Sequence, residues 1–400
     1  MSEANSRLVK VGNAVLILVF LGLLWTPLCA RYFSWGGGAQ LQEKRTLAAR
    51  PVLAWATLAQ WPAAFDRYYA DRFGLRDWLV QAHSNLEWKA LGVSPTDRVC
   101  FGRNDWLFYA AENEIEDYQG THLLTPEELS RWQALLEGKQ AWLQARGIRY
   151  LFVVPPNKGA IYPEFLPSWV KRAPDATTPL DQLGAHLRAH SRVEILDLRQ
   201  ALLEAKKERA VYAPNDLHWT DYGGFVGYRQ ICRRLQQWFP DLRPLQIGDY
   251  HSVQFDYPGD LCLMLGMTRG PAPWELLLPR VPGAQATACA APSFGTLPPM
   301  MFANPPEAFE NPKGRRRLLV FRDSFMNHAP MVSLAENFRH SVFIEVWPGP
   351  DFQALRSMVE QERPDVVVEE CLERKLRYVN VIPDHPEFVL ARSAESKVLR

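Results

Sequence analysis

The feature that most constrains this chain of 400 residues is an apolar run near its N-terminus. Residues 12–30 contain no charged side chain, and residues 14–25 are almost wholly aliphatic. A helix of about 19 apolar residues is long enough to cross a bilayer. Arg7 and Lys10 precede the run, and basic flanks of this kind stay in the cytoplasm. The run therefore predicts that the residues after about 31 are exported.

The same run has a second interpretation, as a cleaved signal peptide. Leu28 stands where signal-peptide cleavage requires a small residue, and Pro27 and Leu28 before Cys29 do not fit a lipoprotein signal. We therefore expect a single-pass inner-membrane helix at 12–30 with a cytoplasmic tail at 1–11, and keep the cleaved signal as the alternative.

The charge balance and the cysteines narrow the function classes. Lysine and arginine number 45 against 44 acidic residues, which gives no support to nucleic-acid binding. An apolar fraction of 47% is enough for a full-sized core. Five cysteines follow the apolar run, without C-x-x-C spacing and without a Cys/His cluster of zinc-ligand spacing, so no disulfide can be assigned and no metal is expected. Those five are Cys100, Cys232, Cys262, Cys289 and Cys371.

The remaining chain divides into segments that differ in amino-acid composition and in predicted secondary structure. Residues 31–95 are rich in Trp, Arg and Ala and predict a helical stalk near the membrane. Residues 96–380 predict an α/β domain, interrupted at 240–315 by a Pro- and Gly-rich stretch that we expect to be an irregular insertion with a few short strands. A tail at 381–400 follows.

Strand and helix patterns alternate along that domain. Strands are predicted at 99–101, 106–109, 150–154, 193–198, 210–213, 318–321, 341–346 and 365–369. Helices are predicted at 126–145, 180–190, 199–209, 221–238, 325–338 and 351–362, the first capped by Thr125. Such alternation predicts a mostly parallel sheet covered by helices on both faces, with sites at the carboxyl ends of its strands.

One candidate site element follows the predicted strand at 210–213. Asp216 and His218 are two residues apart, so in an extended loop they project to the same side and the carboxylate can support the imidazole. Thr220 is the expected N-cap of the next helix. The alternative is a surface histidine beside a capping loop.

A second element is Ser324, at the end of a predicted strand where a helix begins. A serine placed there can attack a carbonyl while backbone N–H groups stabilise the oxyanion. The alternative is an ordinary Asp323/Ser324 helix cap. Taken together, the two elements favour a triad of Ser324, His218 and Asp216. His328, one turn after Ser324, is expected to be a rim or structural residue.

The residues around this triad resemble a known family. Asp216-Leu217-His218-Trp219-Thr220 and Asp323-Ser324-Phe325 resemble the D-x-H-W-T and G-D-S-F motifs of the alginate O-acetyltransferase family, SGNH-hydrolase-like proteins of the bacterial periplasm. The segments 101–108, 153–164 and 364–374 resemble further family motifs in the same order. The resemblance implies an SGNH-like fold with circularly permuted motif order, in the shorter, membrane-anchored branch that lacks a C-terminal carbohydrate-binding module.

Three further residues enter the site as oxyanion or substrate candidates. Asn157 and Lys158 follow the predicted strand at 150–154, with a solvated turn as the alternative. Arg322 stands where the family has glycine before its Asp-Ser pair, so it either narrows the site, supplies a cation to the oxyanion, or weakens catalysis.

The resemblance implies O-acetylation of an exported polysaccharide through a serine acyl-enzyme, without a cofactor. It also implies partners: a polysaccharide acceptor, a multipass membrane O-acyltransferase that supplies acetyl, and other exopolysaccharide synthesis proteins. Two alternatives stay open, a carbohydrate acetyl-esterase with the same triad and a non-catalytic polysaccharide-binding or assembly component.

Overall fold

A computed structural model describes residues 2–33, 47–268, 270, 273–279, 286–292, 304–327 and 333–388. Two compact units are present, and each is described by itself. The N-terminal unit comprises residues 1–99 and 258–271, and the α/β unit comprises residues 100–257 and 272–400.

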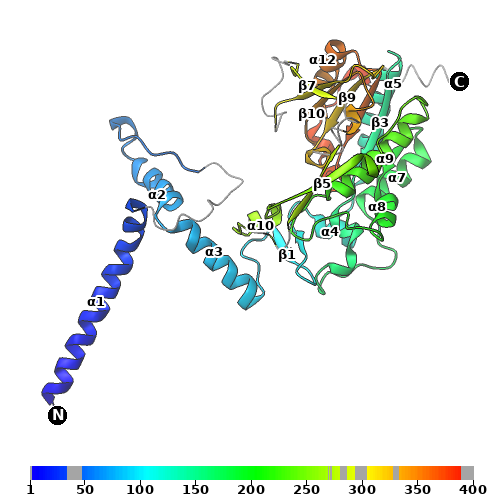
Figure 1. Ribbon diagram of the computed structural model, residues 1–400. Coiled ribbons are helices and arrows are strands. Elements are labelled where there is room, and N and C mark those ends of the chain that lie inside the picture. The colour runs from blue at the N-terminus through cyan, green and yellow to red at the C-terminus, as the bar shows by residue number, and fades with distance from the viewer. Residues whose placement is uncertain are drawn as a thin grey trace. The chain divides into compact units, whose positions relative to one another are not determined.

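The N-terminal unit is helical. Its first helix, α1 (Ser2–Tyr32), contains the apolar run and is drawn in dark blue in Figure 1. Residues Val9–Tyr32 are long and apolar enough to cross a membrane, and most of their side chains are exposed. The other elements are η1 (Trp55–Thr57), α2 (Trp61–Arg72), α3 (Arg76–Leu86), η2 (Glu87–Leu91) and α10 (Asp260–Met264).

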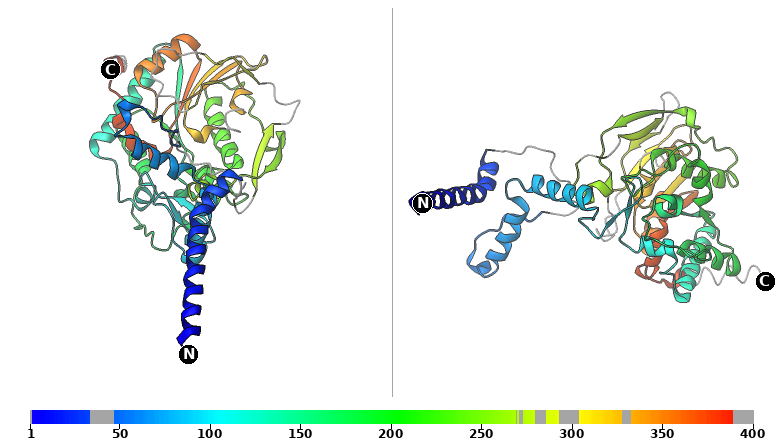
Figure 2. Two further views of the ribbon diagram at one scale, coloured as in Figure 1. Left: turned by 90° about the vertical axis from the view of Figure 1, so that its left-hand side faces the viewer. Right: turned by 90° about the horizontal axis from the view of Figure 1, so that it is seen from below.

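The α/β unit is organised around a seven-stranded sheet, seen in Figure 1 and Figure 2. The strand order is β4-β3-β11-β9-β10-β8-β7. The bounds are β3 (Arg149–Val154), β4 (Ile195–Asp197), β7 (Thr287–Cys289), β8 (Glu307–Glu310), β9 (Arg317–Arg322), β10 (His340–Glu345) and β11 (Val366–Glu370). The first five strands of this order run parallel, so their carboxyl ends meet at one edge.

One end of the sheet differs from the expectation. β8 pairs antiparallel with β10, and β7 pairs antiparallel with β8. Both strands lie within 240–315, so part of the stretch expected to be an irregular insertion extends the main sheet. These strands have only four and three residues, too few for the alternation that reveals a strand in sequence. The same stretch also supplies a separate hairpin of β5 (Tyr250–Phe255) and β6 (Trp274–Pro279).

Most predicted helices are confirmed. α5 (Pro126–Gln144) begins with the expected Thr125 capping box, and α7 (Pro179–His190) begins with a second one at Thr178. Apolar side chains of α5, α7 and α12 (Phe352–Glu362) form one core with alternate residues of β3, β9 and β10. The other elements are β1 (Val99–Phe101), β2 (Leu107–Tyr109), α4 (Glu114–Gln119), α6 (Lys158–Ile161), η3 (Pro163–Phe165), α8 (Arg199–Ala205), α9 (Asp221–Gln236), η4 (Ile247–Asp249), η6 (Ser324–Met326) and η7 (Glu373–Val381).

Two predicted elements beside the candidate site are wrong. Instead of a strand at 210–213, the structure has a single β-bridge between Tyr212 and Trp219, which closes the intervening loop. The helix predicted at 325–338 is wrong over its first residues, where the structure has the single turn η6 and then an extended backbone at Asn327 (φ −76°, ψ 165°), whereas residues 333–335 are helical. His328 lies outside the described residues.

The core contains one buried ion pair that joins α5 to the sheet. The ammonium of Lys139 lies 2.7 and 2.9 Å from the two carboxylate oxygens of Glu369, and the Tyr150 hydroxyl donates to the same carboxylate at 2.7 Å. Lys139 and Glu369 are fully buried. Removing one partner of such a pair leaves the other charge buried and uncompensated.

We therefore expect Lys139→Met to lower the free energy of unfolding by about 3–5 kcal/mol. The double variant Lys139→Met/Glu369→Gln should recover a large part of that loss, because glutamine is neutral and still accepts from Tyr150. Urea denaturation of the three proteins measures both effects. A loss within about 1 kcal/mol for the single variant, as for an exposed pair, would contradict the role given to Lys139.

Candidate active site

The structure brings the three predicted triad residues together. His218 Nδ1 lies 2.8 Å from Asp216 Oδ1, and His218 Nε2 lies 2.8 Å from Ser324 Oγ. Asp216 is buried, whereas the His218 side chain keeps 22% of its surface exposed. An imidazole with a carboxylate on one nitrogen and a serine hydroxyl on the other is the arrangement that activates a serine nucleophile.

Asp216 and His218 lie on the short loop that the Tyr212–Trp219 bridge closes. Besides the side-chain contact, the His218 backbone N–H donates to Asp216 Oδ1 at 2.8 Å, which fixes the carboxylate. The Thr220 hydroxyl caps α9, as expected, by accepting from the Gly223 N–H at 3.1 Å. Gly223 has no room for a Cβ because the Val211 carbonyl oxygen occupies that space, so the first turn of α9 packs directly on the backbone.

The buried side chain of Lys158 donates hydrogen bonds to the backbone of the same loop. Its ammonium donates to the carbonyl oxygens of Ala213 at 2.7 Å, Pro214 at 3.0 Å and Asp216 at 2.9 Å, and to Leu107 at 2.7 Å. The residue is only 1% exposed. The sequence indicated a substrate or oxyanion contact for Lys158, but its surroundings favour a structural role, since its donors are directed at backbone carbonyls.

Ser324 is positioned by the residue before it. Asp323 Oδ1 accepts from the Phe325 N–H at 2.8 Å, and Asp323 Oδ2 accepts from the Leu372 N–H at 3.1 Å. These bonds tie the turn after β9 to the chain that leaves β11. Phe325 itself is buried against the His218 ring, with centroids 5.0 Å apart, so the nucleophile and the base share one packed support.

Glu370 lies beneath this turn and was not anticipated as a site residue. Its Oε2 accepts from the Asp323 N–H at 2.8 Å, and the side chain is buried. Burial, reinforced by the negative charge of Asp323, raises the pKa of Glu370 well above its usual value. The signal available in sequence was a pair of acids ending the apolar run Val366–Val368, at a strand end where burial of a charge requires a reason.

Asn157 is fixed at the carboxyl end of the neighbouring strand β3. Its backbone N–H donates to Glu373 Oε2 at 2.9 Å, and its Oδ1 accepts from the Arg374 N–H at 3.2 Å. The side chain is 3% exposed, and within the described part of the chain its Nδ2 donates no hydrogen bond. The orientation of the amide is thereby set, with the amino group left as a donor.

Arg322 is placed differently from the oxyanion role considered for it. Its side chain is 3% exposed, and its guanidinium donates to Asn327 Oδ1 and lies 3.1 Å from Glu307 and 3.8 Å from Glu345. Register explains this, because Glu345 of β10 is directly opposite Arg322 of β9. The cation is directed at acidic side chains of β8 and β10, so we leave Arg322 out of the oxyanion site.

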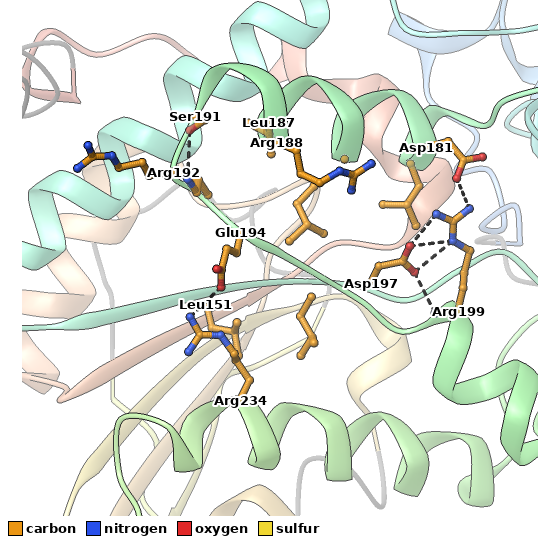
Figure 3. A pocket seen from close by; sticks show the side chains of 15 residues that line it. Leu151, Asp181, Leu187, Arg188, Ser191, Arg192, Glu194, Asp197, Arg199 and Arg234 are labelled. Carbon is orange, nitrogen blue, oxygen red and sulfur yellow. Dashed lines mark hydrogen bonds and ion pairs between the residues drawn. The ribbon is translucent and has the colours of Figure 1, made fainter.

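A separate hollow of about 670 Å³ lies beside β4 and is lined by none of the triad residues. Figure 3 shows Arg199 pointing between Asp181 and Asp197, and Arg234 beside Glu194. Two of its arginines are thus already paired with acids from their own surroundings, and the hollow offers no nucleophile aligned with a base.

Comparison with known proteins finds a family model that matches part of the chain. Residues 99–295 match the family described as SGNH hydrolase-like domain, acetyltransferase AlgX. The resemblance to the alginate O-acetyltransferase family is confirmed. The match includes Asp216 and His218 and ends before Ser324, so the place of Ser324 in the site rests on its 2.8 Å contact with His218.

The chain is also similar to curated proteins and to a solved structure. The chain is 26% identical over 213 residues to a probable alginate O-acetylase AlgJ of Pseudomonas fluorescens, covering 52% of this chain and 50% of that protein. It is 28% identical over 223 residues to the Pseudomonas putida AlgJ, covering 55% and 52%. The chain thus spans about half the length of these relatives. The solved O-acetyltransferase domain of Pseudomonas putida AlgJ superposes with a TM-score of 0.50 at 18% identity, covering 74% of this chain and 99% of that one, which confirms the SGNH-like fold.

Because the pKa of Glu370 is raised, we expect the stability of the fold to depend on pH through this residue. Above about pH 4.5 the unfolded chain loses the Glu370 carboxyl proton, whereas the folded chain retains it. The free energy of unfolding of the wild type therefore falls as the pH rises above that value. A glutamine side chain at this position has no carboxyl proton to lose. The free energy of unfolding of Glu370→Gln, relative to that of the wild type, should therefore rise by up to about 1.4 kcal/mol for each pH unit above pH 4.5.

Urea denaturation at several pH values measures this difference. Glu137→Gln, on the outer part of α5, is the matched control and should follow the wild-type pH profile. Parallel curves for Glu370→Gln and wild type would show that Glu370 is ionised in the fold.

Proposed function

We propose that this protein is an O-acetyltransferase that moves acetyl groups onto hydroxyls of an exported polysaccharide through an acetyl-Ser324 intermediate. The observation that carries the proposal is the pair of 2.8 Å contacts that connect Asp216 through His218 to Ser324. Family membership and the names of the relatives supply the acyl group and the class of acceptor.

In the first half-reaction His218 Nε2 takes the proton of Ser324 Oγ as that oxygen bonds to the acetyl carbonyl carbon of the donor. The bond between that carbon and the donor's leaving atom then breaks, and the leaving group departs with the proton from His218. Asp216 holds the imidazole in the tautomer that keeps Nε2 available and stabilises its positive charge during the transfer. The product is an acetyl ester on Ser324.

In the second half-reaction a sugar hydroxyl replaces the donor. His218 Nε2 removes the hydroxyl proton, the sugar oxygen attacks the ester carbonyl, and Ser324 leaves and recovers the proton. The sugar now carries the acetyl group and the triad is restored. With water in place of the sugar the same steps give hydrolysis, so the triad serves an esterase equally well.

An oxyanion forms in each half-reaction and needs hydrogen-bond donors. We assign this role to the Asn157 Nδ2 group, which the contacts to Glu373 and Arg374 orient, and to the backbone N–H of Ser324. Donors held rigidly before the reaction stabilise the developing charge without reorganisation.

The helix α1 supports a setting for the proposed reaction. An apolar helix over Val9–Tyr32 with a basic flank supports an inner-membrane anchor and a periplasmic α/β unit. A periplasmic enzyme has no direct access to cytoplasmic acetyl donors, which supports a multipass membrane O-acyltransferase as the acetyl supplier. Other exopolysaccharide synthesis proteins complete the proposed pathway.

The test compares acetyl transfer by the full-length protein and its variants from a chromogenic acetyl ester to an oligosaccharide. Ser324→Ala and His218→Ala should each lower transfer by about 10⁴-fold or more, with Asp216→Ala milder, because a triad acts as a unit. Ser130→Ala, on the surface side of α5, is the matched control and should retain wild-type transfer.

The same assay separates the alternatives. Acetyl-oligosaccharide as product supports the transferase, and acetate release that added oligosaccharide does not diminish supports the esterase. Transfer by Ser324→Ala at wild-type rate would overturn the enzymatic role of the triad.

A further inference from the structure

Three potential metal ligands gather on one face of the sheet, far in sequence from one another. Cys289 ends β7, Glu310 ends β8 and His340 begins β10. Glu310 is directly opposite both Thr287 and His340, and Cys289 follows Thr287 by two residues, so all of these side chains project to the same face. Their ligand atoms all lie within 4.8 Å of one another.

The imidazole of His340 is oriented as a metal ligand would be. Its Nε2 lies 3.0 Å from Glu362 Oε2, at the end of α12, so Nε2 carries the proton and donates it to that carboxylate. In the neutral ring Nδ1 then presents a lone pair. It is buried and has no hydrogen-bond partner within the described residues, and its nearest acid, Glu310 Oε1, is 3.8 Å away. Metal-bound histidines commonly donate their other N–H to a carboxylate in this manner.

The Glu362 carboxylate is itself positioned by an ion pair with Arg317. Arg317 Nη2 donates to Glu362 Oε2 at 2.8 Å, so the carboxylate that orients His340 is charge-balanced by a residue of β9. The three remaining groups would present a thiolate, a carboxylate and a neutral imidazole. Their summed charge of minus two matches a divalent cation.

We infer that Cys289, Glu310 and His340 form a binding site for a zinc ion, with Glu362 orienting His340 from the outer shell. Thiolate and imidazole ligands select zinc over magnesium or calcium, which prefer oxygen. Tetrahedral zinc with its usual bond lengths separates ligand atoms by roughly 3.3–3.8 Å. The 3.8 Å between His340 Nδ1 and Glu310 Oε1 is somewhat longer than the roughly 3.4 Å expected for a nitrogen and an oxygen ligand, and the exposed Glu310 side chain can close the difference.

The position of this site indicates a structural role. His340 is paired with Arg317 at the amino end of the parallel strands, whereas Ser324 follows the carboxyl end of β9. A metal here would join the short antiparallel strands β7 and β8 to β10. Three protein ligands leave a fourth position for water.

The test uses the purified full-length protein, stripped with a chelator and titrated with Co²⁺ and then Zn²⁺. One Co²⁺ per chain should bind with a thiolate charge-transfer band in the near ultraviolet, and Zn²⁺ should displace it. Cys289→Ser and His340→Gln should abolish the band. Glu362→Gln should weaken zinc binding about 10–100-fold, as loss of an outer-shell carboxylate does.

Two variants keep this test independent of folding and of the proposed enzyme function. Cys100→Ser changes a partly buried cysteine outside the cluster and should bind as wild type does. Glu310→Gln alters an exposed side chain and should still weaken zinc binding. A wild-type protein without the cobalt–thiolate band, or a band that persists in Cys289→Ser, would overturn the site and leave His340 with a structural role beside Glu310 and Glu362.

Discussion

The arrangement of the triad depends on the hydrogen bonds that the buried ammonium of Lys158 donates. The ammonium donates to carbonyls at Ala213, Pro214 and Asp216, on the loop that carries the acid and base. A single β-bridge closes this loop, and its Pro214 carbonyl also accepts from the Leu107 N–H at 2.8 Å. Burying an ammonium is unfavourable unless its donors find acceptors. The cation therefore requires the loop carbonyls in these positions, and its hydrogen bonds hold them there. The loop is thereby held so that His218 reaches Ser324 from a different part of the chain.

Much of this protein could be predicted from local patterns. The Thr125 capping box placed α5, and the alternation of strands and helices predicted the parallel part of the sheet. The i, i+2 spacing of Asp216 and His218 predicted their contact because it depends on few torsions. Ser324 was placed by its position after a strand, since carboxyl ends of parallel strands share one edge.

The remaining features depend on contacts that no local pattern records. β7 and β8 are too short to show periodicity and exist because β10 offers an edge to pair with. Arg322 looked like an oxyanion candidate until the register set it opposite Glu345. The same strand pairing brings Cys289 to His340, which are 51 residues apart and share no zinc-ligand spacing, so sequence alone argued against the metal site that the fold supports.

The proposed mechanism requires Ser324 to become an acetyl ester during turnover. Brief exposure of the protein to a chromogenic acetyl ester without acceptor, followed by acid quench and peptide mass spectrometry, tests it most directly. We expect one acetyl group per chain, located on Ser324, slow to appear in His218→Ala and discharged by added oligosaccharide. Acetyl release without any label on Ser324, or equal labelling of Ser324 in wild type and His218→Ala, would rule out an acetyl-Ser324 intermediate activated by His218.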